Sequence, residues 1–338
     1  MLSRRMFVGA ASALALTVSM TGGAVAQDKL DVVASFSILG DMVHQIGGDA
    51  VSVTTLVGPD GDAHVYEPTP ADAKALSQAD VLVVNGLDFE GWLPRLVEAS
   101  EFSGRQVVAS TGIDALTWAE PEEGHDHDHD HEAHDHGEHE HNHAEHDHDH
   151  EEHAEEGHHH HGDYDPHAWQ SLGNGMIYAN NIAKALAEAD PAHADGYQER
   201  AEAYVAEQQA LDAKLKKEFG ALPEAHRKVV TSHDAFQYFG KAYGVQFIAP
   251  EGISTEAEPS AADIARIIDQ IRDEQIAAVF VENISDNRVI EQITRETGAK
   301  VGGELYSDAL SGPDGPAPTY VDMFDYNSRQ LLGALSGS

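Results

Sequence analysis

Short apolar runs alternate with amphipathic stretches along most of the chain. In the first part, the runs at 30–36, 51–57, 80–86 and 105–110 have the length and composition of buried β-strands. The stretches between them have helical features, and "TPADAKALSQA" (69–79) opens with a threonine cap and a proline at the first helical position. Strands that alternate with helices predict a parallel sheet with helices on both faces.

The same alternation returns in the second part of the chain. Further buried strands are predicted at 228–232, 245–250, 276–283 and 299–305. Between the two parts, "PAHADGYQERAEAYVAEQQALDAKLKKEF" (191–219) begins with proline and is rich in helix formers, which predicts one extended helix. We therefore expect an α/β protein with two Rossmann-like lobes, each with a parallel sheet, joined by one long rigid helix.

The first residues have the pattern of an export signal. Arg4 and Arg5 precede a stretch rich in Ala, Leu and Val, and Ala24-Val25-Ala26 forms an A-x-A cleavage site. We predict a signal peptide over 1–26, removed near Ala26, and export to the periplasm. "SRRMFV" also resembles a twin-arginine signal, so the twin-arginine and general secretory routes both stay open. No later stretch reaches the roughly 18 apolar residues of a membrane span, and a chain without cysteine has no lipoprotein anchor.

The chain is strongly acidic, with 59 Asp and Glu residues against 20 Lys and Arg residues and a formal net charge of −39. Phosphates would be repelled, so we expect neither nucleic acid nor an anionic membrane surface as a partner. Such a balance suits cations. The absence of cysteine excludes disulfides, thiolate nucleophiles and cysteine-based zinc sites.

Seventeen of the 23 histidines lie in one segment, residues 120–162, where they alternate with Asp and Glu and no Lys or Arg occurs. High charge with almost no apolar residues predicts a disordered, mobile loop. We expect this loop to bind several Zn²⁺ ions weakly and to gather or buffer zinc. The alternative is a solvated segment without such a role. Its histidines are His125, His127, His129, His131, His134, His136, His139, His141, His143, His146, His148, His150, His153, His158, His159, His160 and His161.

Six histidines remain outside this segment, and three of them are interpreted as surface residues of helices or connectors: His44, His193 and His226. The other three, His64, His167 and His233, follow predicted strands or begin an element. Asp308, in "ELYSDAL", has the same kind of position after the last strand. Ligands of open α/β sheets bind beyond the carboxyl ends of the strands, so these four side chains could converge on one cleft. No local motif links them.

Seven segments, in order, resemble the metal-binding solute receptors of bacterial ABC importers, and specifically the zinc branch. These are "DAHVYEPTPAD", "NGLDFEGWL", "DPHAW", "TSHDAFQYF", "ISTEAEPSAADI", "VFVENISD" and "GGELYSDAL". The resemblance covers essentially the whole mature chain except the histidine-rich segment. It implies a metal held in the cleft between two lobes, with His64 and His167 from the N-terminal lobe and His233 and Asp308 from the C-terminal lobe.

The resemblance also implies a domain division and partners. We expect an N-terminal lobe over 27–190, a linking helix over 191–219 and a C-terminal lobe over 220–338. The receptor would be a monomer that delivers its metal to the permease of an inner-membrane ABC importer with a cytoplasmic ATPase. A periplasmic metallochaperone is a further candidate partner.

Three imidazoles and one carboxylate form a borderline-soft ligand set that suits tetrahedral Zn²⁺, here the transported ligand. Manganese receptors that resemble this chain carry a carboxylate at the position of His233. Copper and nickel are not excluded by the order of affinities, and Glu67 is a candidate to replace or supplement one of the ligands. Four protein ligands would leave no open position for catalysis, and no H-E-x-x-H motif occurs, so we expect no enzyme. The alternatives are a manganese or iron receptor, a periplasmic zinc storage protein acting through the loop, and a zinc hydrolase.

Overall fold

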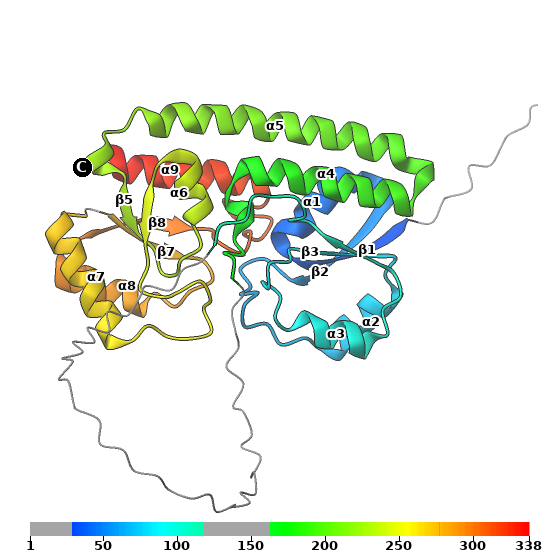
Figure 1. Ribbon diagram of the computed structural model, residues 1–338, viewed down its shortest axis with the longest axis horizontal. Coiled ribbons are helices and arrows are strands. Elements are labelled where there is room, and N and C mark those ends of the chain that lie inside the picture. The colour runs from blue at the N-terminus through cyan, green and yellow to red at the C-terminus, as the bar shows by residue number, and fades with distance from the viewer. Residues whose placement is uncertain (1–28, 118–162, 277, 338) are drawn as a thin grey trace, which may run out of the picture.

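The computed structural model of the protein describes residues 29–117, 163–276 and 278–337. The predicted signal peptide (1–26) and the histidine-rich segment (120–162) lie outside the described residues, so both stay predictions. Within the described ranges the chain forms two α/β lobes that lie side by side beneath a long helix (Figure 1).

The N-terminal lobe is built on a four-stranded parallel sheet with the strand order β2-β1-β3-β4. Its strands are β1 (Leu30–Phe36), β2 (Val51–Val57), β3 (Val81–Val84) and β4 (Arg105–Val108). The helices of this lobe are α1 (Ser37–Gly47), α2 (Pro70–Gln78), α3 (Leu93–Ser100) and α4 (Leu172–Ala189). Thr69 caps α2 by a reciprocal pair of hydrogen bonds with Asp72, and Pro70 occupies the first turn, as the sequence predicts.

Alternate residues of β1 face two different hydrophobic layers, because successive side chains of a strand point to opposite faces of the sheet. Val32 and Ala34 pack in the core that also contains residues of α1 and α4. Val33 packs in a separate cluster with Leu76 of α2 and Leu96 of α3. The sheet therefore has helices on both faces, which explains why its central strands β1 and β3 carry apolar side chains on both faces.

The C-terminal lobe repeats the same topology with the strand order β6-β5-β7-β8, again all parallel. Its strands are β5 (Lys228–Val230), β6 (Gln246–Ile248), β7 (Ala278–Glu282) and β8 (Lys300–Leu305). The helices of this lobe are α6 (Gln237–Tyr243), α7 (Ala261–Glu274), α8 (Arg288–Thr297) and α9 (Tyr320–Ser336). Isoleucines of α7 and α8 cover one face of this sheet, in a cluster with Val230 and Val279.

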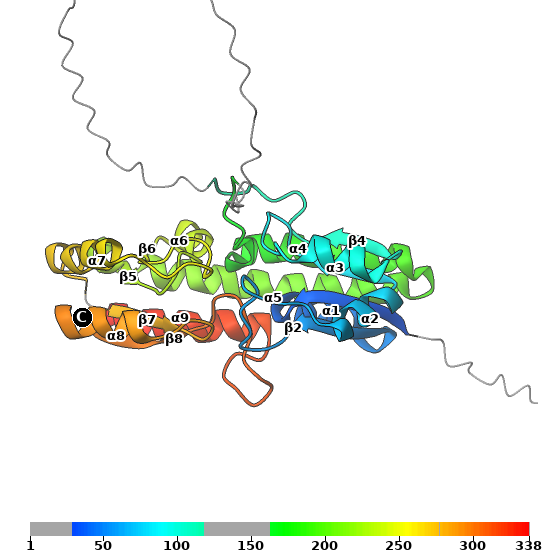
Figure 2. The ribbon, with the colours of Figure 1, turned by 90° about the horizontal axis from the view of Figure 1, so that it is seen from below.

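The long helix α5 (Ala194–Gly220) crosses both lobes (Figures 1 and 2). It packs against α1 and α4 of the N-terminal lobe and against α6 and α9 of the C-terminal lobe. One hydrophobic cluster runs from Val32 in the first sheet through Phe219 of α5 to Phe280 in the second. A core shared by both lobes resists their separation, because opening the lobes would expose this apolar surface.

The predicted fold class is confirmed: two parallel-sheet α/β lobes are joined by a helix. Each of the predicted apolar runs contains one of the strands named above. The strands of the C-terminal lobe are shorter than predicted. After Val230, the backbone N–H groups of Ser232 and His233 donate to the side-chain atom Oε1 of Glu282 instead of to the backbone of a neighbouring strand, and this ends β5.

Candidate metal centre

Four side chains with metal-ligand chemistry meet between the two lobes. Each of His64, His167, His233 and Asp308 offers one ligand atom, and these atoms all lie within 4.8 Å of one another. Nε2 of His64 lies 3.3 Å from Nε2 of His167 and 3.1 Å from Oδ2 of Asp308. Nε2 of His233 also lies 3.1 Å from this carboxylate oxygen. The structure thus brings together all four residues that the sequence singles out.

The sheets explain why these residues meet. His64 lies in the loop after β2, His233 follows β5, and Asp308 follows β8. All three therefore lie beyond the carboxyl ends of parallel strands, where the loops of an open α/β sheet form its binding crevice. His167 immediately precedes a short 3₁₀ helix, Ala168–Gln170, which leads into α4.

The cluster is closed to solvent on most sides. The side chains of His167, His233 and Asp308 are fully buried, whereas 6% of the His64 side chain is exposed. The ring of Phe89 packs edge-on against His64, with 4.9 Å between the ring centroids. Solvent therefore reaches this cluster at His64, and the other ligand atoms lie in a low-dielectric environment where charges interact strongly.

Asp165 orients His167. Its Oδ1 atom accepts hydrogen bonds from Nδ1 of His167, at 2.8 Å, and from the backbone N–H of the same residue, at 2.9 Å. An imidazole that donates through Nδ1 presents an unprotonated Nε2, and metal-bound histidines usually have such a carboxylate partner. The contact therefore prepares Nε2 of His167 to bind a cation.

Glu282 forms an ion pair with His233. Its Oε2 atom lies 2.7 Å from Nδ1 of His233, and both side chains are fully buried. Burial by itself lowers the pKa of His233, but the carboxylates of Glu282 and Asp308 outweigh it and hold the pKa well above its usual value. Burial likewise raises the pKa of Asp308, but His233 and His167 outweigh it and hold this pKa well below its usual value. The cluster thus favours an ionised Asp308 and a bound positive charge.

His64 is held differently. Its backbone N–H donates to Oδ1 of Asp62 at 2.8 Å, and Oδ2 of Asp62 accepts a hydrogen bond from Thr255 Oγ1 of the other lobe at 2.6 Å. Burial lowers the pKa of His64, and the neighbouring Asp308 offsets this only in part. The lowered pKa of His64 favours the neutral imidazole that a metal ion requires.

The loop that carries Asp308 belongs to the C-terminal lobe and is hydrogen-bonded to the N-terminal lobe. The backbone N–H of Leu310 donates to Ser37 Oγ, and its carbonyl oxygen accepts from the backbone N–H of Asp60, both at 2.9 Å. On the other side of Asp308, the carbonyl oxygen of Ser307 accepts hydrogen bonds from Trp169 and Gln170 of the segment that follows His167. These bonds fix the position of Asp308 relative to the N-terminal lobe.

The remaining predicted residues lie elsewhere. The seventeen histidines of segment 120–162 are outside the described residues. Glu67 is exposed and is not part of the four-residue cluster. His44 and His226 are exposed, and Nδ1 of His193 lies 2.5 Å from Asp190, so these three are surface residues as expected.

Two residues of the site did not emerge from the sequence as functional. Asp165 lies two residues before His167 in "DPHAW", and Glu282 ends the apolar run "AAVFVE". A carboxylate at the end of a buried strand is costly unless it has a partner. The carboxylate of Glu282 at the end of an apolar run could therefore have indicated a polar site. Its pairing with His233, in contrast, depends on the strand order.

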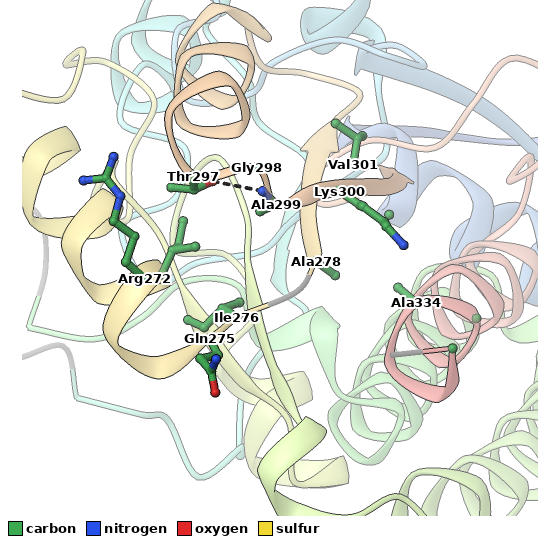
Figure 3. A pocket seen from close by; sticks show the side chains of 14 residues that line it. Arg272, Gln275, Ile276, Ala278, Thr297, Gly298, Ala299, Lys300, Val301 and Ala334 are labelled. Carbon is green, nitrogen blue, oxygen red and sulfur yellow. Dashed lines mark hydrogen bonds between the residues drawn. The ribbon is translucent and has the colours of Figure 1, made fainter.

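The C-terminal lobe also has a hollow at the end of its sheet that lies away from the metal centre, near the amino ends of β7 and β8 (Figure 3). Its volume is about 700 Å³, and Arg272 and Lys300 are its charged lining residues. The described residues that line it include no histidine and no carboxylate. This hollow therefore offers none of the side chains that ligate metals most strongly.

Two similar α/β lobes, a long connecting helix and a buried three-histidine, one-carboxylate cluster between the lobes define a receptor that encloses a small ligand. The chain belongs to the ZnuA family, described as zinc-uptake complex component A, periplasmic, which matches residues 32–334. Members of this family are substrate-binding receptors of metal ABC importers, and such a receptor works with a permease and an ATPase.

Similar proteins carry names that refer to different metals. The iron-binding protein YfeA of Yersinia pestis is 33% identical over 297 residues, which cover 88% of this chain and 83% of that protein. The manganese-binding lipoprotein MntA of Halalkalibacterium halodurans is 32% identical, with 94% of this chain and 92% of the relative covered. The solved periplasmic zinc-binding protein TroA of Treponema pallidum is 26% identical with a TM-score of 0.75, and the match covers 91% and 99% of the two chains.

The comparisons agree that the chain binds a metal ion, but the names of the similar proteins refer to iron, manganese or zinc. None of the helices in the described part of the chain combines the length and the hydrophobicity that a membrane span needs.

Proposed function

We propose that the protein is an exported zinc receptor that captures Zn²⁺ between its lobes and delivers it to the permease of an ABC importer. The observation that carries this proposal is the spacing of the four ligand atoms. Ligand atoms bound to zinc in a tetrahedron, at about 2.0–2.1 Å, lie roughly 3.3 Å from one another. Three of the six ligand-atom pairs are separated by 3.1 to 3.3 Å, close to this spacing, and all four atoms lie within 4.8 Å of one another.

The chemistry of the ligand set supports zinc over harder metals. Three imidazole nitrogens and one carboxylate favour Zn²⁺, whereas Mn²⁺ prefers a set richer in oxygen. His233 is the decisive ligand here, since a carboxylate at that position would make the site harder. The competing proposal, a manganese or iron receptor, is favoured by the names of relatives such as YfeA and MntA.

The remaining parts of the proposal rest on the sequence. Residues 1–26 would direct export and be removed, leaving a soluble, monomeric periplasmic receptor with lobes over 27–190 and 220–338 and a linking helix over 191–219. The histidine-rich segment 120–162 would gather or buffer further zinc at weak sites. A periplasmic metallochaperone would be a source of the metal. Four protein ligands close a tetrahedral sphere, which supports binding without catalysis.

The test is a metal-competition titration with elemental analysis on the mature protein with and without residues 124–162. One tight Zn²⁺ per chain is expected in both forms, and a weak multi-ion phase only in the form that keeps the segment. His64→Ala should weaken the tight phase at least a hundredfold, because it removes one of four ligands. His44→Ala, which changes an exposed histidine of α1, serves as the matched control.

Three outcomes would decide against the zinc receptor. Preferential retention of manganese or iron in the competition would support the other metal receptors. Loss of the tight phase when 124–162 is deleted would point to zinc storage through that segment. Unchanged tight binding in His64→Ala would show that the cluster is not the site.

A further inference from the structure

The hydroxyl of Tyr238 joins two chain segments that lie far apart in the sequence. Tyr238 lies in α6 of the C-terminal lobe, and its side chain is buried. Its Oη atom accepts a hydrogen bond from the backbone N–H of Leu116 and donates one to the backbone carbonyl oxygen of Asp165, both at 2.9 Å. Leu116 and Asp165 lie on either side of the histidine-rich segment 120–162.

The two segments are also paired with each other. The backbone N–H of Asp165 donates to the carbonyl oxygen of Leu116 at 2.9 Å, and Thr117 and Tyr164 form an isolated antiparallel bridge. In addition, Lys241 of α6 lies 3.8 Å from the carboxylate of Asp114. Helix α6 therefore holds the paired segments 114–117 and 163–165 at the place where the histidine-rich segment begins and ends in the sequence.

The same contacts lead directly to the metal centre. Asp165 is held by Tyr238 through its backbone, and its side chain accepts the hydrogen bond from Nδ1 of His167. A continuous hydrogen-bonded chain therefore runs from Leu116 through Tyr238 and Asp165 to His167. Both residues between its ends, Tyr238 and Asp165, are buried, so water does not compete for these bonds.

We propose that Tyr238 is a positioning residue that couples the tight metal site to the paired segments 114–117 and 163–165. This inference rests on the proposed function. A metal ion on Nε2 of His167 strengthens the hydrogen bond between Nδ1 and Asp165, and this in turn stabilises the pairing of the two segments. Coupling between sites is reciprocal, so a change in the pairing alters the metal affinity by the same factor. Tyr238 thus links the segments that flank the histidine-rich segment in the sequence to the enclosed ion.

The test compares Tyr238→Phe with Tyr243→Phe in the full mature chain. Both residues are buried tyrosines of α6, but the hydroxyl of Tyr243 donates to Asp212, away from the metal centre. Chelator competition with zinc alone as the probe should show a Kd about 3- to 10-fold higher for Tyr238→Phe. This is less than the 10- to 100-fold effect expected when a direct partner of a metal-bound histidine is changed. Tyr243→Phe should leave the Kd within twofold of the wild type.

A second readout separates positioning from a general loss of stability. Hydrogen exchange of the Leu116 amide should become slower when zinc binds to the wild type and to Tyr243→Phe. In Tyr238→Phe, the exchange of this amide should be faster and no longer respond to zinc. If Tyr238→Phe retained both the wild-type Kd and the zinc-dependent protection of Leu116, the coupling would be wrong. A wild type that lacks tight zinc binding would instead overturn the proposed function, before any variant is compared.

Discussion

Gln170 Nε2 donates a hydrogen bond of 2.6 Å to the backbone carbonyl oxygen of Ser307. This bond connects the segment that follows His167 with the residue that precedes Asp308. Two ligands from distant parts of the chain therefore have their backbones fixed relative to each other. This connection therefore helps to set the position of His167 relative to Asp308.

Replacing Gln170 by leucine should weaken metal binding without removing a ligand. The side chain is fully buried, so Leu can occupy the space, but the donor to Ser307 is lost. Trp169 still donates to the same oxygen, at 2.9 Å, so the cost is that of one hydrogen bond, about 1 kcal/mol. We expect a Kd for zinc about 5-fold higher by chelator competition. Gln198→Leu, on the exposed face of α5, is the control, and an equal effect of both changes would contradict this role.

Glu282→Gln should weaken metal binding more strongly. The change removes the negative charge beside Nδ1 of His233 and keeps the size of the side chain. Changing the carboxylate partner of a metal-bound histidine typically costs 10- to 100-fold in affinity. We expect a loss of at least 10-fold in competition titrations, whereas Glu224→Gln, at an exposed position, should have no effect. A Glu282→Gln protein with the wild-type Kd would show that this contact does not support His233.

Zinc binding should release about one proton at pH 7. The carboxylates around His233 hold its pKa well above the usual value, so the metal-free protein carries a proton on this imidazole at neutral pH. A bound metal needs the unprotonated nitrogen, so the proton must leave. The affinity should therefore rise with pH until the pH exceeds this raised pKa. Calorimetry in buffers of different ionisation enthalpy measures the number released, and a value of zero at pH 7 would contradict the assignment.

The raised pKa of Glu251 predicts that the stability of the metal-free protein depends on pH. Burial and the nearby carboxylates of Glu282 and Asp62 raise its pKa to about 7, and His233 opposes this. The folded protein thus binds more protons than the unfolded chain between about pH 4.5 and 7, so stability falls as the pH rises through that window. Because the side chain is partly exposed, solvent screening reduces the effect to about 1 kcal/mol.

Glu251→Gln should therefore stabilise the metal-free protein at pH 8 and have little effect at pH 4.5. The measurement is thermal or urea unfolding at both pH values, with Glu256→Gln of the same loop, an exposed side chain, as the control. If Glu251→Gln shifted stability equally at both pH values, titration of Glu251 would not be the cause.

The sequence predicts the ligands better than it predicts the groups that orient them. His64, His233 and Asp308 follow strands that are visible as apolar runs, and the carboxyl ends of parallel strands form a crevice in a known way. The pairing of Glu282 with His233 depends instead on the fact that β7 lies next to β5. Local patterns do not contain this strand order.

The contact between Tyr238 and Leu116 could be predicted from the sequence even less well than the pairing of Glu282 with His233. It requires the orientation of α6 relative to a segment 122 residues earlier in the chain. A phenylalanine at position 238 would give the same hydrophobic pattern, so the pattern carries no information about the hydroxyl. Such polar contacts between lobes arise from tertiary packing, for which a single sequence offers no periodic signal.

Replacing Gly175 by alanine tests whether the packing beneath α5 also supports the metal centre. A methyl group at this position of α4 would lie 2.7 Å from Oε1 of Gln208 and would also clash with the hydroxyl of Tyr320. That hydroxyl donates a hydrogen bond of 2.6 Å to the carbonyl oxygen of Trp169, two residues after His167. Gly175→Ala should therefore displace Tyr320 and loosen the turn that holds His167.

Overpacking of a core typically costs about 1–3 kcal/mol, which outweighs the gain of up to about 1 kcal/mol from replacing glycine by alanine in a helix. We expect urea unfolding of Gly175→Ala to show a lower free energy of unfolding, and competition titration to show a higher Kd for zinc. Gly173→Ala, two residues earlier in α4, is the matched control, since its methyl group would meet only Ser171 at an ordinary contact distance of 3.4 Å. A loss of stability in Gly175→Ala with an unchanged Kd would mean that Tyr320 supports the fold but not the position of His167.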